Sequence, residues 1–195
     1  KRKGSLDGQT EGDSQMSQSS IIPKFSTNLT KKARNGELQP FFGRTEEINN
    51  LVHTLSRKTK SNAIIVGKPG IGKTALIEGL AQLIAAGDVP NNLKNKEILT
   101  VDLSALVSGA KYRGQFEERL KGFISAIKEE KNRYILFFDE FHQIIGLGRS
   151  SDSNLDGSTI LKPELARGEI SCIGATTEKE FKSYMENDNA FLRRF

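Results

Sequence analysis

The stretch GKPGIGKT, residues 67–74, crowds three glycines, a proline and two lysines into eight positions directly after the apolar run AIIV. It matches G-x-x-x-x-G-K-[ST], the phosphate-binding loop, in the context that this motif needs, with a strand before it and a helix after it. Glycines let backbone N–H groups turn toward phosphate oxygens, and the start of the helix adds partial positive charge. The alternative is a glycine-rich turn that matches the motif by chance. The preceding strand, the following helix, the lysine and the threonine together argue against that alternative.

Two side chains at the end of the loop carry the expected chemistry. The ammonium group of Lys73 can reach the β- and γ-phosphates of a nucleotide, and the hydroxyl group of Thr74 can ligate Mg²⁺. The sequence therefore predicts that ATP and Mg²⁺ are the cofactors. The residues of this stretch predicted to contact ATP are Gly67, Lys68, Pro69, Gly70, Ile71, Gly72, Lys73, Thr74 and Ala75.

A second group follows four apolar residues in ILFFDE, residues 135–140. The preceding strand would place Asp139 at the edge of the sheet nearest the phosphates, where it can hold Mg²⁺ directly or through water. Glu140 is next, and it could polarise a water for attack on the γ-phosphate. The alternative is a solvated acidic pair that only ends a strand. The neighbouring phosphate-binding motif favours the catalytic interpretation.

Three weaker signals remain. A polar side chain in GATT, residues 174–177, could contact the γ-phosphate, although threonine is common in strands. Lys111, Tyr112 and Arg113 lie between glycines and suit either an exposed loop that grips a polypeptide or a loop whose tyrosine packs on its own domain. Adjacent arginines in AFLRRF could be solvated, or could be arginine fingers that stabilise charge on a transferring phosphoryl group.

These residues need strands and helices that alternate along the chain. Apolar runs predict strands over residues 61–67, 97–103, 133–140 and 169–177. Helical spacing of apolar residues predicts helices over 43–57, from the phosphate loop to Gly87, over 113–130 and over 178–188. Such alternation indicates an α/β fold with a parallel sheet between helices, in which ligands bind beyond the carboxyl ends of the strands.

Length and composition limit the remaining possibilities. The 195 residues suffice for one α/β domain, and no apolar run approaches the length of a membrane span. A net charge of +5 is compatible with anionic partners but does not by itself indicate nucleic acid. A single cysteine fits a reducing compartment. Residues 1–25 are polar and low in apolar content, so we expect a disordered tail or linker there, with the folded domain over 26–195.

Taken together, the motifs resemble those of a known family. Residues 27–195 are similar to the first ATPase module of the Clp/heat-shock AAA+ unfoldases, the group that contains ClpA, ClpB and ClpC. The matching segments include FFGRTEEI, GKPGIGKTALIEGLAQLIAAGDVP, GAKYRGQFEERLK, ILFFDEFH, ILKPELARGEISCIGATT and NAFLRRF. TNLT and ILKP-LARGE resemble ClpC more closely, whereas GAKYRG resembles ClpB, and the balance favours ClpC.

The resemblance implies roles that spacing could not assign. Thr177 would sense the γ-phosphate, and Arg193 and Arg194 would act on the nucleotide of a neighbouring subunit in a hexameric ring. Phe42 and Gly43 would lie beside the adenine. Tyr112, flanked by Lys111 and Arg113, would line the central pore and pull unfolded polypeptide through it, with residues 146–159 as a second pore loop. A Clp peptidase is an implied possible partner.

Several departures from the family accompany the match. Lys68 stands where the family usually has an acid, and in DEFHQ a phenylalanine replaces the commoner Leu or Val directly after the acidic pair. The family's helical lid, and the strand that follows its arginine pair, would lie beyond residue 195. We therefore expect an isolated fragment to be mainly monomeric and nearly inactive as an ATPase.

Two other functions fit part of the pattern. A nucleic-acid AAA+ machine, such as a helicase or clamp loader, shares the phosphate loop and the acidic pair, but AKYRG and the contiguous Clp-like motifs favour an unfoldase without nucleic-acid or membrane partners. A nucleotide-binding scaffold that no longer hydrolyses ATP is opposed by the intact Glu140 and the arginine pair. The Ser-rich tail and the ClpC-like motifs suggest a plastid-type stroma, with a bacterial cytoplasm as the alternative.

Overall fold

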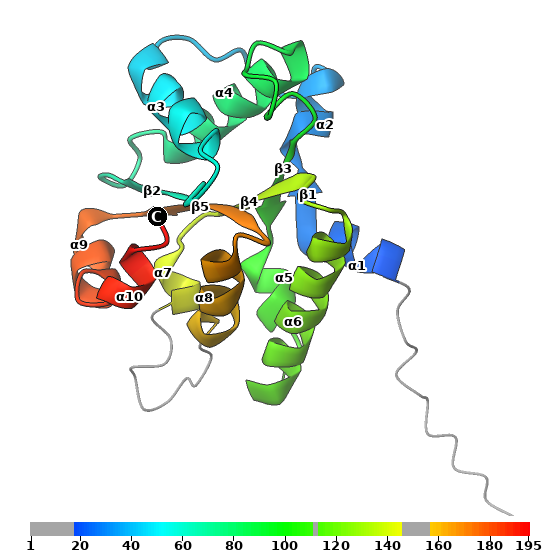
Figure 1. Cartoon of the computed structure of the whole chain (residues 1–195), viewed down its shortest axis with the longest axis vertical. Helices are drawn as coiled ribbons and strands as arrows, with labels where there is room; N and C mark the ends of the chain where they lie inside the picture. The colour runs from blue at the N-terminus through cyan, green and yellow to red at the C-terminus, as the bar shows by residue number, and fades with distance from the viewer. Residues whose placement is uncertain (1–17, 111–112, 146–156) are drawn as a thin grey trace, which may run out of the picture.

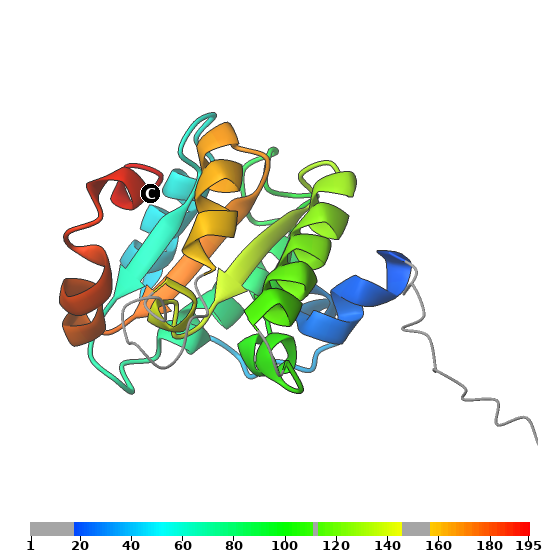
Figure 2. The same ribbon diagram turned by 90° about the horizontal axis from the view of Figure 1, so that it is seen from below.

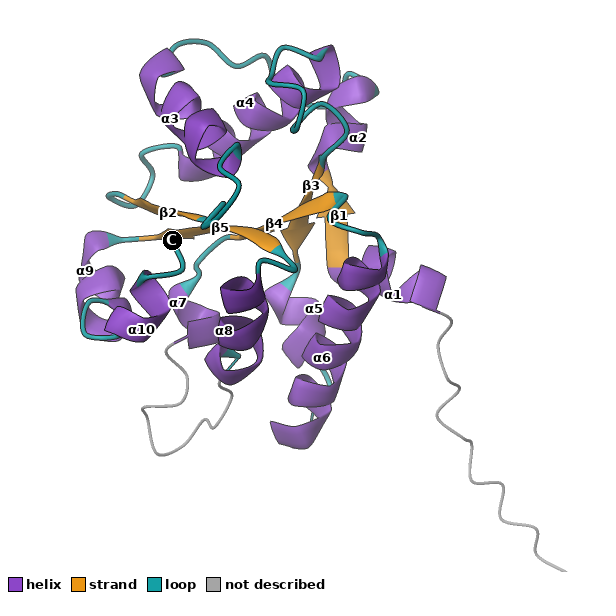
Figure 3. Ribbon diagram, in the orientation of Figure 1, coloured by secondary structure: helices purple, strands orange, loops and turns teal. Residues whose placement is uncertain are grey.

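The computed structural model describes residues 18–110, 113–145 and 157–195. Its sheet has the strand order β1-β3-β4-β5-β2. Figures 1 and 3 show helices on both faces of this sheet, with α2, α3 and α4 on one side and α5, α6, α7, α8 and α10 on the other. The strands are β1 (Ser26–Asn28), β2 (Ala63–Val66), β3 (Glu97–Val101), β4 (Tyr134–Phe138) and β5 (Ser171–Thr176).

The helices follow the predicted alternation and add several short ones. They are α1 (Gln18–Phe25), α2 (Leu29–Arg34), α3 (Thr45–Leu55), α4 (Lys73–Ala86), α5 (Leu103–Val107), α6 (Arg113–Glu129), α7 (His142–Ile145), α8 (Ser158–Arg167), α9 (Glu178–Glu180) and α10 (Asn189–Leu192), with a π-helical turn η1 (Phe181–Met185) after α9. The region predicted as one helix over 178–188 is therefore α9 followed by η1. No described helix is long and apolar enough to cross a membrane.

Four of the strands are parallel, as predicted, and the fifth is not. β2 pairs with β5, β5 with β4 and β4 with β3, all in parallel, whereas β1 pairs with β3 in the antiparallel direction. β1 has only three residues, too few for an alternating pattern to reveal it in the sequence. Two apolar layers fill the two faces, one around Phe123 and Phe138 and the other around Leu80 and Phe137.

The N-terminal segment is more ordered than the sequence indicates. Residues 18–25, which we expected to belong to a disordered tail, form α1 and pack against α6. Phe25 is buried and its ring meets that of Phe123 edge to face at 6.5 Å, while Ile21 lies over Gly122. These few apolar residues stand among polar ones, which hides the helix from composition. Residues 1–17 of the predicted tail lie outside the described residues.

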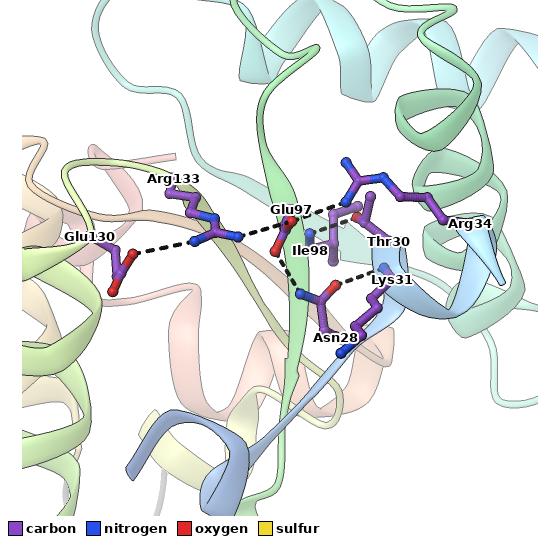
Figure 4. A network of polar contacts seen from close by, with 8 residues as sticks. All are labelled: Asn28, Thr30, Lys31, Arg34, Glu97, Ile98, Glu130 and Arg133. Carbon is purple, nitrogen blue, oxygen red and sulfur yellow. Dashed lines mark hydrogen bonds and ion pairs between the residues drawn. The ribbon is translucent and has the colours of Figure 1, made fainter. Parts of the chain in front are cut away.

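A polar network fastens the same segment to the sheet (Figure 4). The Glu97 carboxylate, at the start of β3, accepts hydrogen bonds from Asn28 at 2.7 Å, Arg34 at 3.0 Å and Arg133 at 3.3 Å. Burial raises the pKa of Glu97, but these hydrogen bonds and the charge of Arg133 outweigh it and leave the pKa below its ordinary value. The buried Thr30 hydroxyl accepts a hydrogen bond from the Ile98 amide at 2.9 Å. The network joins three segments that are distant in the sequence.

Candidate functional site

The loop between β2 and α4 has the backbone that its glycines predict. Gly70 and Gly72 have φ angles of 75° and 88°, in the left-handed region that side chains disfavour. Gly72 directly precedes the first residue of α4, so the free N–H groups of that helix start open onto the loop. The Gly67 amide donates to the carbonyl of Thr176 at 3.2 Å, which ties the loop to the end of β5.

Lys73 lies inside this loop rather than in solvent. Its side chain is largely buried, and its ammonium donates to the carbonyls of Gly67 at 2.9 Å and Lys68 at 3.0 Å. By contrast, the Lys68 residue is exposed. A cation held by loop carbonyls beside free helix N–H groups is suited to bind phosphate oxygens.

The two predicted magnesium ligands meet across the sheet edge. The Thr74 hydroxyl donates to one carboxylate oxygen of Asp139 at 2.9 Å, although 65 positions separate them in the sequence. The other oxygen of Asp139 accepts the backbone amide of Glu140 at 3.0 Å. A hydroxyl and a carboxylate in contact form the oxygen donor pair that Mg²⁺ uses in phosphate-loop enzymes. The residues present therefore fit a magnesium–nucleotide complex.

Glu140 stands in an unusual backbone conformation next to a histidine. Its φ angle is 51°, which is uncommon for a non-glycine residue and turns the chain sharply after β4. Its carboxylate lies 3.4 Å from Nε2 of His142, whose Nδ1 lies 3.1 Å from the hydroxyl of the buried Thr176. The imidazole also stacks on the ring of Tyr184. His142 therefore connects the proposed general base to the end of β5.

The sequence pattern did not predict His142 as part of the site. The only signal was its place two residues after Glu140, within the matching segment ILFFDEFH. A lone histidine after a strand has no periodicity, so its contacts with β5 could come only from the tertiary structure.

The ends of β4 and β5 are locked together by close packing. The Phe141 amide donates to the carbonyl of Ala175 at 2.8 Å, and the Phe141 ring lies against Gly174. A Cβ atom at Gly174 would fall 2.3 Å from that ring, so only glycine fits there. Thr177, the predicted sensor, caps α9, and its hydroxyl accepts from the amide of Glu180 at 3.3 Å. Thr177 directly follows β5, and its role as a sensor of the γ-phosphate stays a prediction.

The segment before α3 borders the phosphate loop. Phe41 lies on Gly79 of α4, and the guanidinium of Arg44 donates to the carbonyls of Ile71 and Gly72, each at 3.0 Å. This contact of Arg44 with the phosphate loop was not predicted from the sequence. It orients the carbonyls of Ile71 and Gly72 toward the Arg44 side chain. Phe42 is 86% exposed and lines, with Gly43, an open hollow beside α4. Their predicted contact with adenine stays a prediction.

The arginine pair lies far from this chain's own phosphate loop. The carbonyl of Arg194 accepts from the side-chain amide of Asn62 at 2.8 Å, just before β2 begins, whereas the loop follows the other end of β2. Figure 2 shows the C-terminus near the strand ends opposite those that lead to α7 and α9. Phe191 and Phe195 pack on Phe141 at centroid distances of 5.7 and 5.8 Å, so the arginines stand on an anchored segment.

The predicted pore loop is only partly described. Lys111 and Tyr112 lie outside the described residues, as do residues 146–156 of the predicted second pore loop. The backbone of Arg113 begins α6. The predicted roles of these residues are therefore not tested.

Comparison with known proteins gives the family. The model of the ATPase family associated with various cellular activities (AAA) matches residues 63–195. The chain is 52% identical over 174 residues to the chaperone protein ClpB of Staphylococcus epidermidis, and 50% identical over the same length to heat shock protein hsp98 of Neurospora crassa. These alignments cover 89% of the chain but 20% and 19% of those relatives, so the chain spans about a fifth of their length.

Solved structures agree in fold. The chain superposes on Saccharomyces cerevisiae Hsp104 bound to ADP with a TM-score of 0.79 and 47% identity, over 89% of this chain and 24% of that one. It matches a closed-state reconstruction of Hsp104 with ATPγS and casein equally well, with a TM-score of 0.79 and 47% identity over 90% and 29% of the two chains. The fold class predicted from the sequence is confirmed. The chain belongs to the AAA family of ATPases, and within it is a Clp-type module.

Proposed function

We propose that this module binds Mg²⁺-ATP at residues 67–75 and hydrolyses it with Glu140 as the general base. The observation that carries the proposal is the hydrogen bond between Thr74 and Asp139, with Lys73 held inside the adjacent loop. Two predicted magnesium ligands and a phosphate-binding cation thus converge from two strand ends. The Hsp104 structures that contain ADP and ATPγS support nucleotide binding by the same fold.

Each group has a distinct part in this chemistry. Lys73 would exchange its carbonyl partners for phosphate oxygens, and the Thr74 hydroxyl and Asp139 carboxylate would hold the magnesium ion. Bound Mg²⁺ would neutralise charge that develops on the phosphates. Glu140 would accept the proton of the attacking water, with Thr177 near the γ-phosphate and Arg193 and Arg194 supplied to a neighbouring subunit.

The work driven by this hydrolysis would be the unfolding and threading of polypeptides in a hexameric ring. Hsp104 has been solved with casein, and the relatives reported above are heat-shock and ClpB chaperones, which supports a polypeptide substrate over nucleic acid. Lys111, Tyr112 and Arg113 would contact the substrate. A Clp peptidase partner, the preference for ClpC, and the choice between a plastid-type stroma and a bacterial cytoplasm stay predictions.

Calorimetric titration of the chain with Mg²⁺-ATP tests the nucleotide site. Lys73→Ala removes a charge-assisted contact worth about 1.5–3 kcal/mol, so the affinity should fall by roughly 10- to 150-fold. Lys121→Ala is the matched control, because that lysine is exposed on α6 outside the phosphate loop, and it should bind like the unaltered chain. Equal affinities for both variants would remove Lys73 from the site.

A capture experiment with the whole protein tests the substrate class. Unfolded casein and single-stranded DNA are offered in parallel in the presence of ATPγS, with Tyr112→Ala as the variant. We expect casein to be retained and retention to fall in the variant, because a methyl group offers little contact area. Retention of DNA alone would favour the nucleic-acid alternative.

A further inference from the structure

A second cationic site lies at the opposite end of the sheet from the phosphate loop. A hollow of about 490 Å³ opens at the amino ends of β2 to β5. We call it the basic hollow. Its lining includes six cationic side chains, contributed by four separate parts of the chain: Arg57, Lys58, Lys60, Lys96, Arg167 and Arg194.

The charge in this hollow is not balanced by the protein. None of the described residues that line it is an aspartate or a glutamate. Arg167 alone among the six makes an ion pair with a described carboxylate, a marginal one at 3.9 Å to Glu164. Nearby cations outside the hollow behave differently: Lys128 pairs with both Glu164 and Glu169, and Arg133 pairs with Glu97. The lack of carboxylates is thus a property of the hollow rather than of the surrounding surface.

Lys96 makes the imbalance more costly. Its ammonium donates to the carbonyl of Asn132, and burial lowers its pKa below the ordinary value. A partly desolvated cation without a counter-charge lowers the stability of the folded protein. A bound anion would offset this loss of stability. The lining also includes neutral polar side chains, among them Ser61, whose hydroxyl lies 3.3 Å from that of Ser171, and Asn92, whose side-chain amide donates to the Ser56 carbonyl at 3.0 Å.

We propose that the basic hollow binds a small polyphosphate anion, either inorganic or the phosphate chain of a nucleotide. Six positive charges around one hollow match an anion with several charges better than a single carboxylate, and lysine and arginine are the usual phosphate partners. The site is separate from the phosphate loop, because the five steps from Asn62 to Gly67 span roughly 16 Å of extended chain. The proposal does not depend on Arg194, since the other five cations come from other segments.

The hollow differs in kind from the phosphate loop. It has no glycine-rich stretch, and its cations stand mainly on exposed loops, with Lys60 at a φ of 55° in the turn before β2. Attraction there is electrostatic and weakly directional, so affinity should rise with the number of anion charges and fall steeply with salt. An acidic peptide would meet the same charges, and the experiment therefore includes one.

Inorganic tripolyphosphate is titrated by calorimetry at low salt into the Lys73→Ala variant, in which the phosphate loop is weakened and no nucleotide competes for the hollow. We expect binding that weakens about tenfold in the double variant Lys58→Gln/Lys60→Gln, which removes two charges near the anion. The double variant Lys31→Gln/Lys32→Gln, on exposed positions of α2 outside the hollow, is the matched control and should bind normally. Lys58→Arg/Lys60→Arg keeps the charge and should restore affinity, which separates binding from folding.

Three further arms complete the test. Pyrophosphate should bind more weakly than tripolyphosphate, and monophosphate more weakly still. A titration of nucleotide beyond saturation of the phosphate loop distinguishes a nucleotide source from inorganic polyphosphate, and either source supports the site. Tripolyphosphate binding that is unaffected by the Lys58 and Lys60 variants, or a hexaglutamate peptide that binds while tripolyphosphate does not, would overturn the proposal. If Lys73→Ala loses ATP binding but still binds tripolyphosphate, this proposal stands. The proposals for the phosphate loop and for the basic hollow can therefore be refuted independently.

Discussion

The two ends of the parallel sheet hold positive charge in opposite ways. At the carboxyl ends, a single largely buried lysine, Lys73, is held by loop carbonyls between glycines in left-handed conformations. At the amino ends, the six cations of the basic hollow stand mainly on loops and have almost no carboxylate partners. The first arrangement fixes direction and distance, as chemistry requires, whereas the second supplies charge without fixed geometry. Charge alone therefore does not identify a catalytic site, and the surrounding backbone does.

The largest expected effect tests whether the carboxyl edge performs the chemistry. Glu140→Gln keeps the shape of the side chain but cannot accept a proton, so ATP turnover by the whole protein should fall by about 10²- to 10⁴-fold while binding is kept. Gln143→Ala, three residues later and exposed, is the control. Phosphate release and calorimetric ATP binding are measured together. Normal turnover in Glu140→Gln would assign the general base elsewhere.

A second prediction concerns the rigidity of that edge. Gly174→Ala would place a Cβ 2.3 Å from the Phe141 ring, and overpacking of this kind costs about 1–3 kcal/mol of unfolding free energy. Urea denaturation followed by circular dichroism measures it. Gly114→Ala, where an added Cβ meets nothing within 4 Å, should leave stability unchanged or slightly higher. A neutral Gly174→Ala would show that the carboxyl edge is as adaptable as the basic hollow.

The contact between His142 and Glu140 sharpens the comparison, because it is a side-chain restraint on the proposed general base. His142→Ala removes the partner of the Glu140 carboxylate and of Thr176, so turnover should fall by about 2- to 12-fold, the range of one hydrogen bond of 0.5–1.5 kcal/mol. ATP affinity should stay the same, and His142→Gln should recover part of the loss. A fall in affinity with normal turnover would contradict a positioning role.

The smallest effect concerns the Glu97 network, whose cations are balanced by an acid, unlike those of the hollow beside it. The pKa of Glu97 is lower in the folded chain than its ordinary value, so the unfolded chain binds the extra proton. The stabilisation is thus present above the ordinary pKa and is lost as pH falls through the folded pKa. Glu97→Gln should cost about 0.5–1 kcal/mol at neutral pH, because two partners are half exposed.

Urea unfolding at neutral and acid pH checks this sign. The difference between the unaltered chain and Glu97→Gln should shrink at acid pH, when the carboxylate of the unaltered chain is protonated. Glu118→Gln, an exposed position on α6, should show no such change. A difference that grows as the pH falls would contradict the assigned direction.

Local patterns sufficed for the elements that are long or strongly apolar. The run Ile135–Phe138 predicted β4, helical spacing predicted α3, α4 and α6, and the glycine pattern predicted the loop after β2. These features depend on residues that are neighbours in the chain. Their periodicity or motif can therefore be recognised in the sequence itself. The same reasoning predicted Lys73 and Thr74 at the start of a helix and Asp139 directly after a strand, which is where the structure has them, while their roles in catalysis stay predictions.

What tertiary structure alone decided are the contacts between segments that the sequence keeps apart. α1 and the antiparallel β1 are too short or too polar to show a pattern, and they are stabilised by burial against α6 and pairing with β3. His142 reaches Thr176, Arg44 reaches Gly72, and the cations of the basic hollow come together only because the amino ends of parallel strands share one edge. The distances between these residues are set when the chain folds, and the spacing of residues along the sequence does not predict them.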